Sequence, residues 1–176
     1  MAFSSIYLLT IISLFLFPTM SISTSLKSMH FTFYQHDIVN KTDFMIIKGI
    51  TGADLSLTAS PFGSIFILHD PLTISPDPSS DLIGHAEGAT ITSSFDGLDN
   101  LSIGKFTLNF RAHKGSFSVL GSVNNLKPSD IPVVGGTGDF MFVQGFLRSS
   151  LVDIKGLYFV YKVEANLYWP PFATTL

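Results

Sequence analysis

The sequence predicts an all-β fold whose antiparallel sheet closes into a barrel. Apolar and polar residues alternate with a period of two over long stretches, which is typical of strands that bury one face. Glycine, proline and aspartate separate these stretches, and no convincing helical pattern follows the N-terminal segment. A sandwich is the alternative, but a barrel closes its edges and can hold one small ligand, so the barrel is favoured.

The expected strands follow one another along the chain. Phe31 and Phe33 share one face of the first strand, and a mostly apolar run lies between Pro61 and Pro71. Two glycines inside the third strand, at positions 84 and 88, predict bulges. The expected strands cover residues 30–36, 62–68, 82–95, 103–113, 116–123, 131–134, 140–148 and 157–169, and residues 71–81 form a surface loop.

A glycine-rich stretch, residues 131–145, predicts a hairpin. Its apolar arms flank three glycines within residues 135–138, and glycine takes the positive φ angles of tight turns without a steric cost. Asp139 follows this turn and would be held on a rigid frame, which suits a functional carboxylate. A dinucleotide loop is disfavoured, because the third glycine of that pattern would fall at Met141 and no helix follows.

Length and composition exclude several classes of function. The 176 residues suit one domain, and the net charge of -3 argues against nucleic acid or an anionic membrane as a partner. The sequence has no cysteine, which excludes thiol catalysis and thiolate metal sites. No HxH or HExxH spacing supports a metal centre, so we expect no metal and no cofactor.

The N-terminal residues 1–23 predict a secretory signal peptide, which leaves a single barrel domain over residues 24–176. The apolar residues 5–17 are too few to cross a bilayer comfortably, and the small residues that follow offer a cleavage site. No lysine or arginine precedes this apolar run, so a retained anchor is the alternative. After cleavage we expect a secreted, extracellular protein with no membrane association.

Two N-glycosylation sequons fit a secreted protein. Asn40 begins an Asn-Lys-Thr sequon and Asn100 begins an Asn-Leu-Ser sequon. A glycan needs an accessible acceptor, so both asparagines are predicted to lie in surface loops.

Three aspartates near expected strand ends are candidates for chemistry: Asp37, Asp70 and Asp139. The first two directly follow histidines, His36 and His69. If these strand ends share one barrel mouth, carboxylates and imidazoles would converge on an aromatic pocket, as a general-acid site requires. The alternative is that each aspartate caps a turn.

Several blocks of residues occur together in one order along most of the chain. They are Tyr34-Gln35-His36-Asp37, Phe62-Gly63-Ser64, His69-Asp70-Pro71-Leu72-Thr73, Gly84-His85-Ala86-Glu87-Gly88, Phe117-Ser118-Val119-Leu120-Gly121 and the segment from Pro132 to Phe140. In these blocks, and in their order, the sequence resembles the plant dirigent protein family.

The resemblance implies an eight-stranded antiparallel β-barrel, like that of allene oxide cyclase or the lipocalins. It also implies a glycosylated protein of the apoplast or cell wall, assembled as a homodimer or homotrimer. Dirigent proteins have no oxidative activity of their own. A laccase or peroxidase makes phenoxy radicals from a monolignol such as coniferyl alcohol, and the barrel directs their coupling to one enantiomer of a lignan.

This role makes the expected protein a stereodirecting auxiliary of phenylpropanoid and lignan biosynthesis rather than an enzyme. Two alternatives remain open. One is a dehydratase or cyclase that acts on a phenolic quinone-methide precursor, as in pterocarpan formation. The other is a wall or defence protein with a degenerate pocket.

The family's motifs also assign site residues. Asp37, Asp70 and Asp139 match the pocket carboxylates, which would orient phenol hydroxyls and assist proton transfer. Where the family has an aspartate, a tyrosine and an arginine, this sequence has histidine, threonine and glutamine, and loss of the arginine removes a permanent cation. The residues expected to bind substrate are Tyr34, His36, His69, Thr90 and Gln144.

Overall fold

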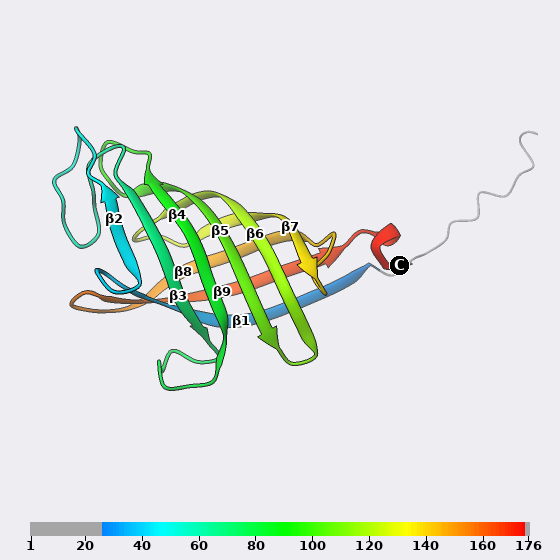
Figure 1. Cartoon of the computed structure of the whole chain (residues 1–176). Helices are drawn as coiled ribbons and strands as arrows, with labels where there is room; N and C mark the ends of the chain where they lie inside the picture. Colours follow the sequence, from blue (N-terminus) through cyan, green and yellow to red (C-terminus); the bar gives the residue numbers. More distant parts are fainter. Residues whose placement is uncertain (1–25, 175–176) are drawn as a thin grey trace, which may run out of the picture.

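The computed structural model describes residues 26–174, which form nine strands and one short 3-10 helix (Figure 1). The predicted signal peptide, residues 1–23, lies outside the described residues. No helix in the described range is long and apolar enough to cross a membrane. The elements are β1 (Lys27–Ile38), β2 (Asp43–Ile47), β3 (Ile65–Thr73), β4 (Leu82–Thr92), β5 (Asp99–Phe110), β6 (His113–Asn124), β7 (Ser129–Gly138), β8 (Gln144–Lys155), β9 (Tyr158–Trp169) and η1 (Pro171–Thr174).

The sheet closes into an eight-stranded antiparallel barrel, which confirms the predicted fold class. From β3 to β9 each strand pairs with the next one in sequence, and β9 pairs with the whole of β1. The barrel closes between β1 and β3, which pair only through Tyr34↔Thr73 and Gln35↔Leu72. The short strand β2 pairs with β3 beside this seam and was not expected from the sequence.

The seam contains a fork, which we define as residues 36–43, where β1 leaves β3 and β2 takes its place. Beyond Gln35, β1 continues along β9 as far as the pair Ile38↔Tyr158. A turn then returns the chain to β3, where β2 begins with the pair Asp43↔Leu68. The backbone N–H of His69 donates to the carbonyl oxygen of Thr42 at 2.8 Å, so the turn is bonded to β3.

Figure 1 shows β2 at one end of the barrel, with the start of β1 and the end of β9 at the other. An aromatic core fills that other end. The rings of Phe33, Phe106, Phe117 and Phe140 contact one another in that order, with centroid distances of 5.9, 5.5 and 5.4 Å. Trp169, at the end of β9, lies next to Phe140. Burial of these large rings at inward positions supplies much of the hydrophobic stabilisation of the barrel.

The predicted hairpin is present, but its turn lies further along the chain than expected. β7 continues through the glycines to Gly138, which pairs with Gly115 of β6, and β8 begins at Gln144. The turn is formed by residues 139–143. A Cβ atom on Gly136 would lie 2.2 Å from the carbonyl oxygen of Phe140, so glycine is needed there to let the turn fold back and bury Phe140.

The two glycines of β4 behave differently from each other. A register shift lies beside Gly84, because Leu72 pairs with Gly84 while Thr73 pairs with Leu82, so the irregularity falls at Ile83, one residue before the predicted bulge. Gly88 pairs regularly with strands on both sides, so the second bulge was predicted wrongly. Gly88 instead allows close approach of β5, since an added Cβ would lie 2.1 Å from the carbonyl oxygen of Ile103.

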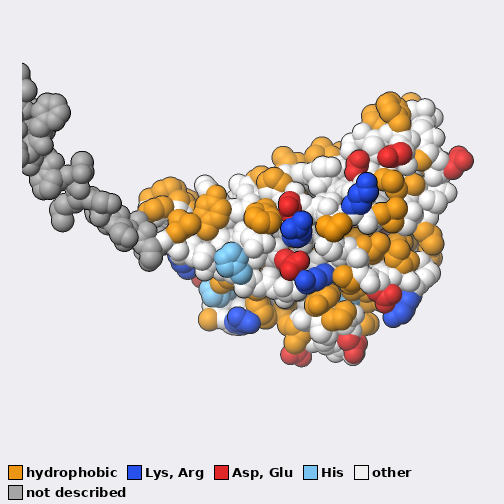
Figure 2. Space-filling view, turned by 180° about the vertical axis from the view of Figure 1, so that it is seen from behind, with side chains coloured by type: hydrophobic (Ala, Val, Ile, Leu, Met, Phe, Trp, Pro, Cys, Tyr) orange, Lys and Arg blue, Asp and Glu red, His pale blue; other side chains and the backbone are white. Residues whose placement is uncertain are grey.

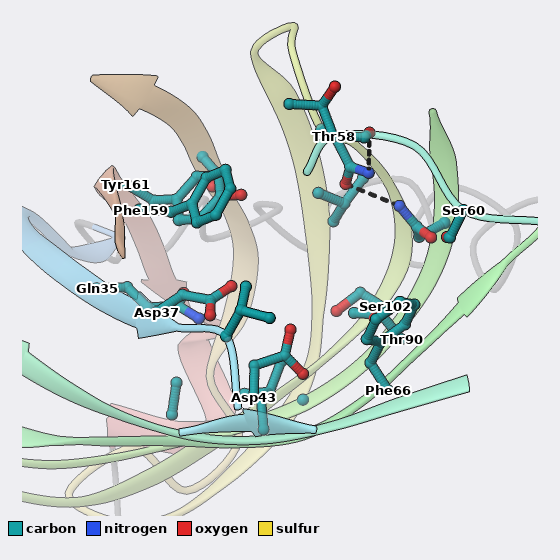
Figure 3. Close-up of a pocket in the computed structure, with 18 of the residues that line it drawn as sticks. Gln35, Asp37, Asp43, Thr58, Ser60, Phe66, Thr90, Ser102, Phe159 and Tyr161 are labelled. Atoms are coloured by element: carbon teal, nitrogen blue, oxygen red, sulfur yellow. Dashed lines mark hydrogen bonds between the residues drawn. The ribbon is translucent and has the colours of Figure 1, made fainter. Parts of the chain in front are cut away.

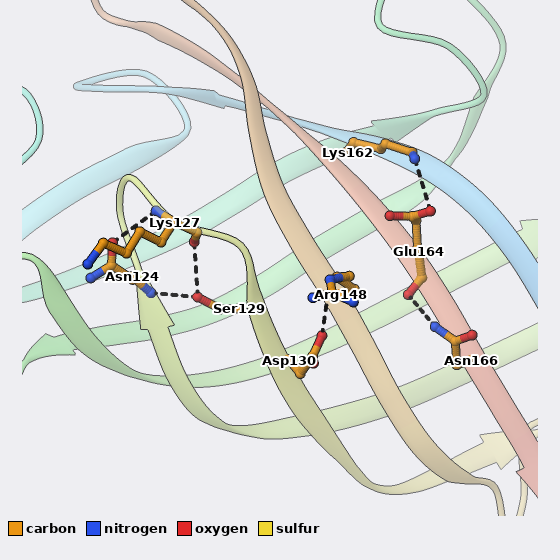
Figure 4. A network of polar contacts seen from close by, with 8 residues as sticks. All are labelled: Asn124, Lys127, Ser129, Asp130, Arg148, Lys162, Glu164 and Asn166. Carbon is orange, nitrogen blue, oxygen red and sulfur yellow. Dashed lines mark hydrogen bonds and ion pairs between the residues drawn. The ribbon is translucent and has the colours of Figure 1, made fainter.

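The outer face of β7, β8 and β9 carries paired charges. Arg148 lies 3.6 Å from Asp130 on the neighbouring strand, and Lys162 lies 2.9 Å from Glu164 (Figure 4). The face shown in Figure 2 accordingly has acidic and basic side chains next to one another, with apolar patches between them and no basic tract. Exposed pairs of this kind contribute little to stability, typically below about 1 kcal/mol each.

We predict that Gly88→Ala lowers the free energy of unfolding by about 1 to 3 kcal/mol, the usual cost of overpacking. The added Cβ meets backbone of β5, which cannot move without disturbing the ladder. Gly104→Ala is the matched control, because the atom nearest to its Cβ would be a side-chain carbon of Val119, at 3.1 Å, and not a backbone atom. Urea unfolding followed by circular dichroism compares the two variants, and equal losses would contradict the close-approach explanation.

Candidate functional site

A cavity of about 310 Å³ occupies the barrel interior at the end where β2 lies (Figure 3). Its walls carry the aromatic rings of Phe66, Phe106, Phe159 and Tyr161, together with aliphatic side chains. These residues alternate along their strands with outward-facing neighbours, so the period of two places them inside. Pockets of about 300 Å³ and above are large enough to enclose a small organic ligand.

The segment between β2 and β3, residues 48–64, covers part of this cavity, and we call it the mouth segment. The hydroxyl of Ser60 lies 2.6 Å from that of Thr92, and Asn125 donates its side-chain N–H to the carbonyl oxygen of Thr58 at 2.8 Å. Asn100 joins the two contacts, because it accepts from Thr92 and donates to Asn125. This network fixes the mouth segment to β4 and β5.

The fork brings three carboxyl groups to the cavity side of the seam. Asp37 comes from the end of β1, Asp43 from the start of β2 and Asp70 from the middle of β3. We call these three residues the acid cluster. Asp37 and Asp43 line the cavity and point toward it in Figure 3, whereas Asp70 is fully buried.

The acid cluster has few hydrogen-bond partners. Gln35 donates its side-chain N–H to Oδ2 of Asp70 at 2.7 Å. Within the described chain, the Oδ1 atoms of all three aspartates are buried and have no hydrogen-bond partner. Buried carboxyl oxygens without partners are costly, so such an arrangement points to a functional role.

Burial and mutual repulsion raise the pKa values of the acid cluster. The pKa of Asp37 is raised first by burial and then by the charges of Asp70 and Asp43. Burial, with the charge of Asp70, raises the pKa of Asp43 to about 7. Burial also raises the pKa of Asp70, but hydrogen bonds from Thr42 and Gln35 oppose that shift. Near neutral pH the cluster can therefore hold both a protonated carboxyl and a carboxylate.

No cation offsets these acids inside the cavity. Among the residues of the described chain that line it, none is a lysine, an arginine or a histidine. Glu87 also contributes to the wall, but its carboxylate is paired with Lys105 and lies near His69 on the outer face. The hydroxyl of Tyr161 lies in the same environment, where burial and the three aspartates raise its pKa well above the ordinary value.

The structure brings together three of the residues predicted from the sequence. Asp37 and Asp70 meet in the acid cluster, and Thr90 lines the cavity opposite them (Figure 3). The convergence of these two carboxyl groups was expected. Asp70 is not at a strand end, however, because β3 continues to Thr73.

The expectation that Asp139 joins these carboxyl groups is wrong. Asp139 is exposed in the turn between β7 and β8, at the filled end of the barrel. Its carboxylate accepts the backbone N–H of Lys114 at 2.7 Å, so it caps a turn, which is the alternative that the sequence had left open. Gln144 lies at the start of β8, is exposed, and does not line the cavity either.

Both histidines that precede the aspartates lie outside the cavity. His69 is exposed and stacks on His85 on the outer face of β3 and β4. His36 is buried between the hydroxyls of Tyr158 and Thr73, at 2.5 and 2.6 Å, and burial lowers its pKa. The physical reason is the same in both cases: adjacent residues of a strand point to opposite faces, so an inward aspartate requires an outward histidine.

Tyr34 shares the outward face of β1 with His36 and does not line the cavity. Three residues that do contribute to the site were missed: Gln35, Asp43 and Tyr161. Tyr161 alternates with Val160 and Lys162 and shares a face with Phe159 and Val163, so the sequence did contain a signal for it. The sequence contained no comparable signal for Asp43. Its strand, β2, has only five residues, and the apolar residues Phe44, Ile46 and Ile47 in it are exposed, so no buried face marks the strand.

The two sequons lie in different environments. Asn40 is exposed in the turn of the fork, with a left-handed φ of 62°, at the edge of the cavity. Asn100 is only 4% exposed and uses its side-chain amide in the network of the mouth segment. The expectation that Asn100 lies in a surface loop is therefore wrong, because the residue lies within β5 and faces the barrel interior.

We predict that secretion from a plant cell yields a glycan at Asn40 and none at Asn100, since a glycan cannot be accommodated at a buried, bonded amide. Peptide mass spectrometry after enzymatic deglycosylation in water labelled with oxygen-18 measures both sites in one sample. A fully occupied Asn100 on folded protein would contradict the burial of its side chain.

The acid cluster also predicts how stability depends on pH. Because the folded pKa values lie above the unfolded value of about 4, the folded chain binds more protons than the unfolded chain between these limits. Stability therefore falls as the pH rises through about 7, where Asp43 ionises. We expect the urea midpoint of the wild type to fall between about pH 5 and about pH 8, and that of Asp37→Asn to fall less. Parallel pH profiles for the two proteins would contradict the shifted pKa values.

Comparison with known proteins places the chain in one family. A dirigent protein of Sinopodophyllum hexandrum is 31% identical over 161 residues, covering 86% of this chain and 83% of that protein. Pterocarpan synthase 1 of Glycyrrhiza echinata is 26% identical over 133 residues, covering 73% of this chain and 70% of that protein.

Among solved structures, one of a pterocarpan synthase dirigent protein resembles the barrel with a TM-score of 0.72. It is 21% identical and covers 82% of this chain and 91% of that chain, so it supports the fold. The family described as dirigent-like protein matches residues 28–168, and the chain therefore belongs to the dirigent family.

Proposed function

We infer that the chain binds an uncharged phenol in its cavity and uses the acid cluster to form and trap a quinone methide. The observation that supports this proposal is the acid cluster itself, with buried carboxyl oxygens that lack partners beside an aromatic cavity. A carboxyl group that titrates near neutral pH can donate a proton and accept one during a single reaction.

The substrate class that fits is a phenol with a benzylic hydroxyl group. A protonated carboxyl of the acid cluster donates its proton to that hydroxyl, the benzylic C–O bond breaks, and water leaves. A neighbouring carboxylate takes the phenol proton, so the phenol oxygen becomes the carbonyl oxygen of the quinone methide. A second hydroxyl of the same molecule then adds to the methide carbon, and its proton returns through the cluster to the phenol oxygen. The net change is loss of one water and closure of one ring.

Asp37 and Asp43 suit the two proton-transfer roles, because both line the cavity. Asp70 is fully buried and bonded to Gln35, so it acts on the reaction through its charge, which raises the pKa values of the other two. Thr90 and Ser102 on the opposite wall can orient the phenol hydroxyls (Figure 3). This assignment makes the chain a dehydratase or cyclase, and it agrees with the similarity of the chain to a protein named pterocarpan synthase.

Stereodirected coupling of phenoxy radicals is the second candidate, and the aromatic walls of the cavity favour it. Phe66, Phe159 and Tyr161 present ring surfaces on which phenols such as coniferyl alcohol can stack. A laccase or peroxidase would supply the radicals, and the acid cluster would act afterwards, on the quinone methides that coupling to a lignan leaves. Secretion to the apoplast, and assembly as a homodimer or homotrimer, remain predictions from the N-terminal sequence and the family.

Two assays of the purified chain separate the candidates. We expect it to convert an isoflavanol with a free phenol to a pterocarpan without any oxidase, with product chirality read by chiral chromatography. Asp37→Asn should lower kcat by about 10²-fold or more, the usual contribution of a general acid. Asp139→Asn is the matched control, because that carboxylate is exposed at the other end of the barrel and its loss should leave kcat unchanged.

The second assay combines coniferyl alcohol with laccase, with and without the chain. No turnover of the isoflavanol, together with an enantiomeric excess in the laccase reaction, would replace our proposal by the second candidate. Equal turnover by Asp37→Asn and Asp139→Asn would remove the acid cluster from the mechanism.

A further inference from the structure

The cavity has acidic side chains and no basic side chain among the described residues that line it, which favours a positively charged ligand. Asp37 and Asp43 face the cavity, and Asp70 is buried beside them. Among the described residues that line the cavity there is no cationic side chain. The ammonium group of Lys105 near this wall lies on the outer face, where it is paired with Glu87, and His69 contacts Glu87 on the same face.

A second observation also points to a ligand. Asp70 is fully buried, yet its Oδ1 atom has no hydrogen-bond partner in the described chain, and the same holds for Oδ1 of Asp37 and Asp43. These oxygens come from three different strands that the fork brings together. A buried carboxylate is stable only when a positive group or hydrogen-bond donors compensate for its lost hydration. The missing compensation is the kind that a cationic ligand supplies.

We propose that the cavity is a binding site for aromatic amines in their ammonium form, with the ammonium group held by the acid cluster. An ammonium ion offers three N–H donors on one atom, so it can bond both cavity-lining carboxyl groups, Asp37 and Asp43, at once. The ring of such a ligand lies against the aromatic wall, where Phe159 and Tyr161 are close to Asp37 (Figure 3). Aromatic faces also attract a desolvated cation, which adds to the carboxylate interaction.

The proposal depends on the charge of the cavity and not on any reaction in it. It does agree with the proposed function, because acid-assisted loss of a benzylic hydroxyl builds positive charge on the ligand, and the same carboxyl groups would stabilise that charge. An amine would then act as a competitive ligand that mimics the positive charge developing in the transition state for loss of the hydroxyl.

Binding of an ammonium ion and binding of a neutral phenol depend on pH in opposite ways. The groups that face the bound nitrogen are Asp37 of β1, Asp43 of β2 and Tyr161 of β9, with Gln35 as a neutral donor. Asp70 of β3 is buried beside them, and its charge acts on the same groups. A bound cation favours the ionised carboxylates, so its affinity rises with pH and binding releases protons. A neutral ligand that accepts hydrogen bonds from protonated carboxyl groups loses affinity over the same range.

Three ligands of nearly the same shape test the proposal: tyramine, tyrosol and 4-hydroxyphenylacetate, which carry a cation, a neutral hydroxyl and an anion at the same position. Isothermal titration calorimetry at about pH 5.5 and about pH 8, in two buffers of different ionisation enthalpy, gives affinity and proton release. At the higher pH we expect tyramine to bind at least about tenfold more tightly than tyrosol, with proton release, and 4-hydroxyphenylacetate to bind weakest.

Single substitutions test whether the acid cluster causes the preference for tyramine over tyrosol. Asp37→Asn and Asp43→Asn, each alone, should reduce the ratio of tyramine to tyrosol affinity, whereas Asp139→Asn should preserve it. Tyrosol binding as tightly as tyramine, binding of neither, or a preference that survives both cluster variants would overturn the proposal. Turnover of the isoflavanol is read separately, so a chain that catalyses but prefers tyrosol refutes this inference and leaves the proposed function standing.

Discussion

The fork in the barrel seam is the constraint on which the site depends. β1 pairs with β9 along its whole length but with β3 only at Tyr34 and Gln35, so these two residues alone close the described barrel directly. β2 then restores the pairing with β3 after a turn. Three aspartates therefore meet in the opening between three strands, where the barrel has neither a continuous ladder nor bulk water to stabilise a charge.

The rest of the barrel makes this arrangement possible. The ring contacts from Phe33 to Trp169 fill one end, and the polar network around Asn100 fixes the mouth segment at the other. A rigid barrel of this kind can hold buried carboxyl groups that are individually unfavourable, because the barrel unfolds as one unit and its other contacts outweigh the free energy lost at those groups. The stability lost at the acid cluster is thus offset by the aromatic core, and the cavity keeps its protonated carboxyl groups.

Much of the fold could be predicted from the sequence, because period-two alternation reports directly on which side chains point inward. The same rule could have shown that His36 and Asp37 point to opposite faces of the sheet, and likewise His69 and Asp70, since adjacent residues in a strand do so. Asp139 could not be placed in this way, because the glycines before it continue β7 and shift the turn. The role of Asp43 could not be predicted from the sequence, since its short strand lies near Asp70 only because the chain turns back at the fork and pairs with β3.

We expect carboxyl groups inside the barrel to remain protonated at a pH where ordinary aspartates are ionised. Carbon-13 NMR of the aspartate side-chain carboxyl carbons, followed from about pH 3 to about pH 9 and assigned with Asp37→Asn and Asp43→Asn, measures this protonation directly. Asp43 should titrate with a pKa of about 7, and Asp37 should also titrate well above its ordinary range. If every aspartate carbon instead titrated near the ordinary value of about 4, the buried acid cluster and the chemistry assigned to it would be contradicted.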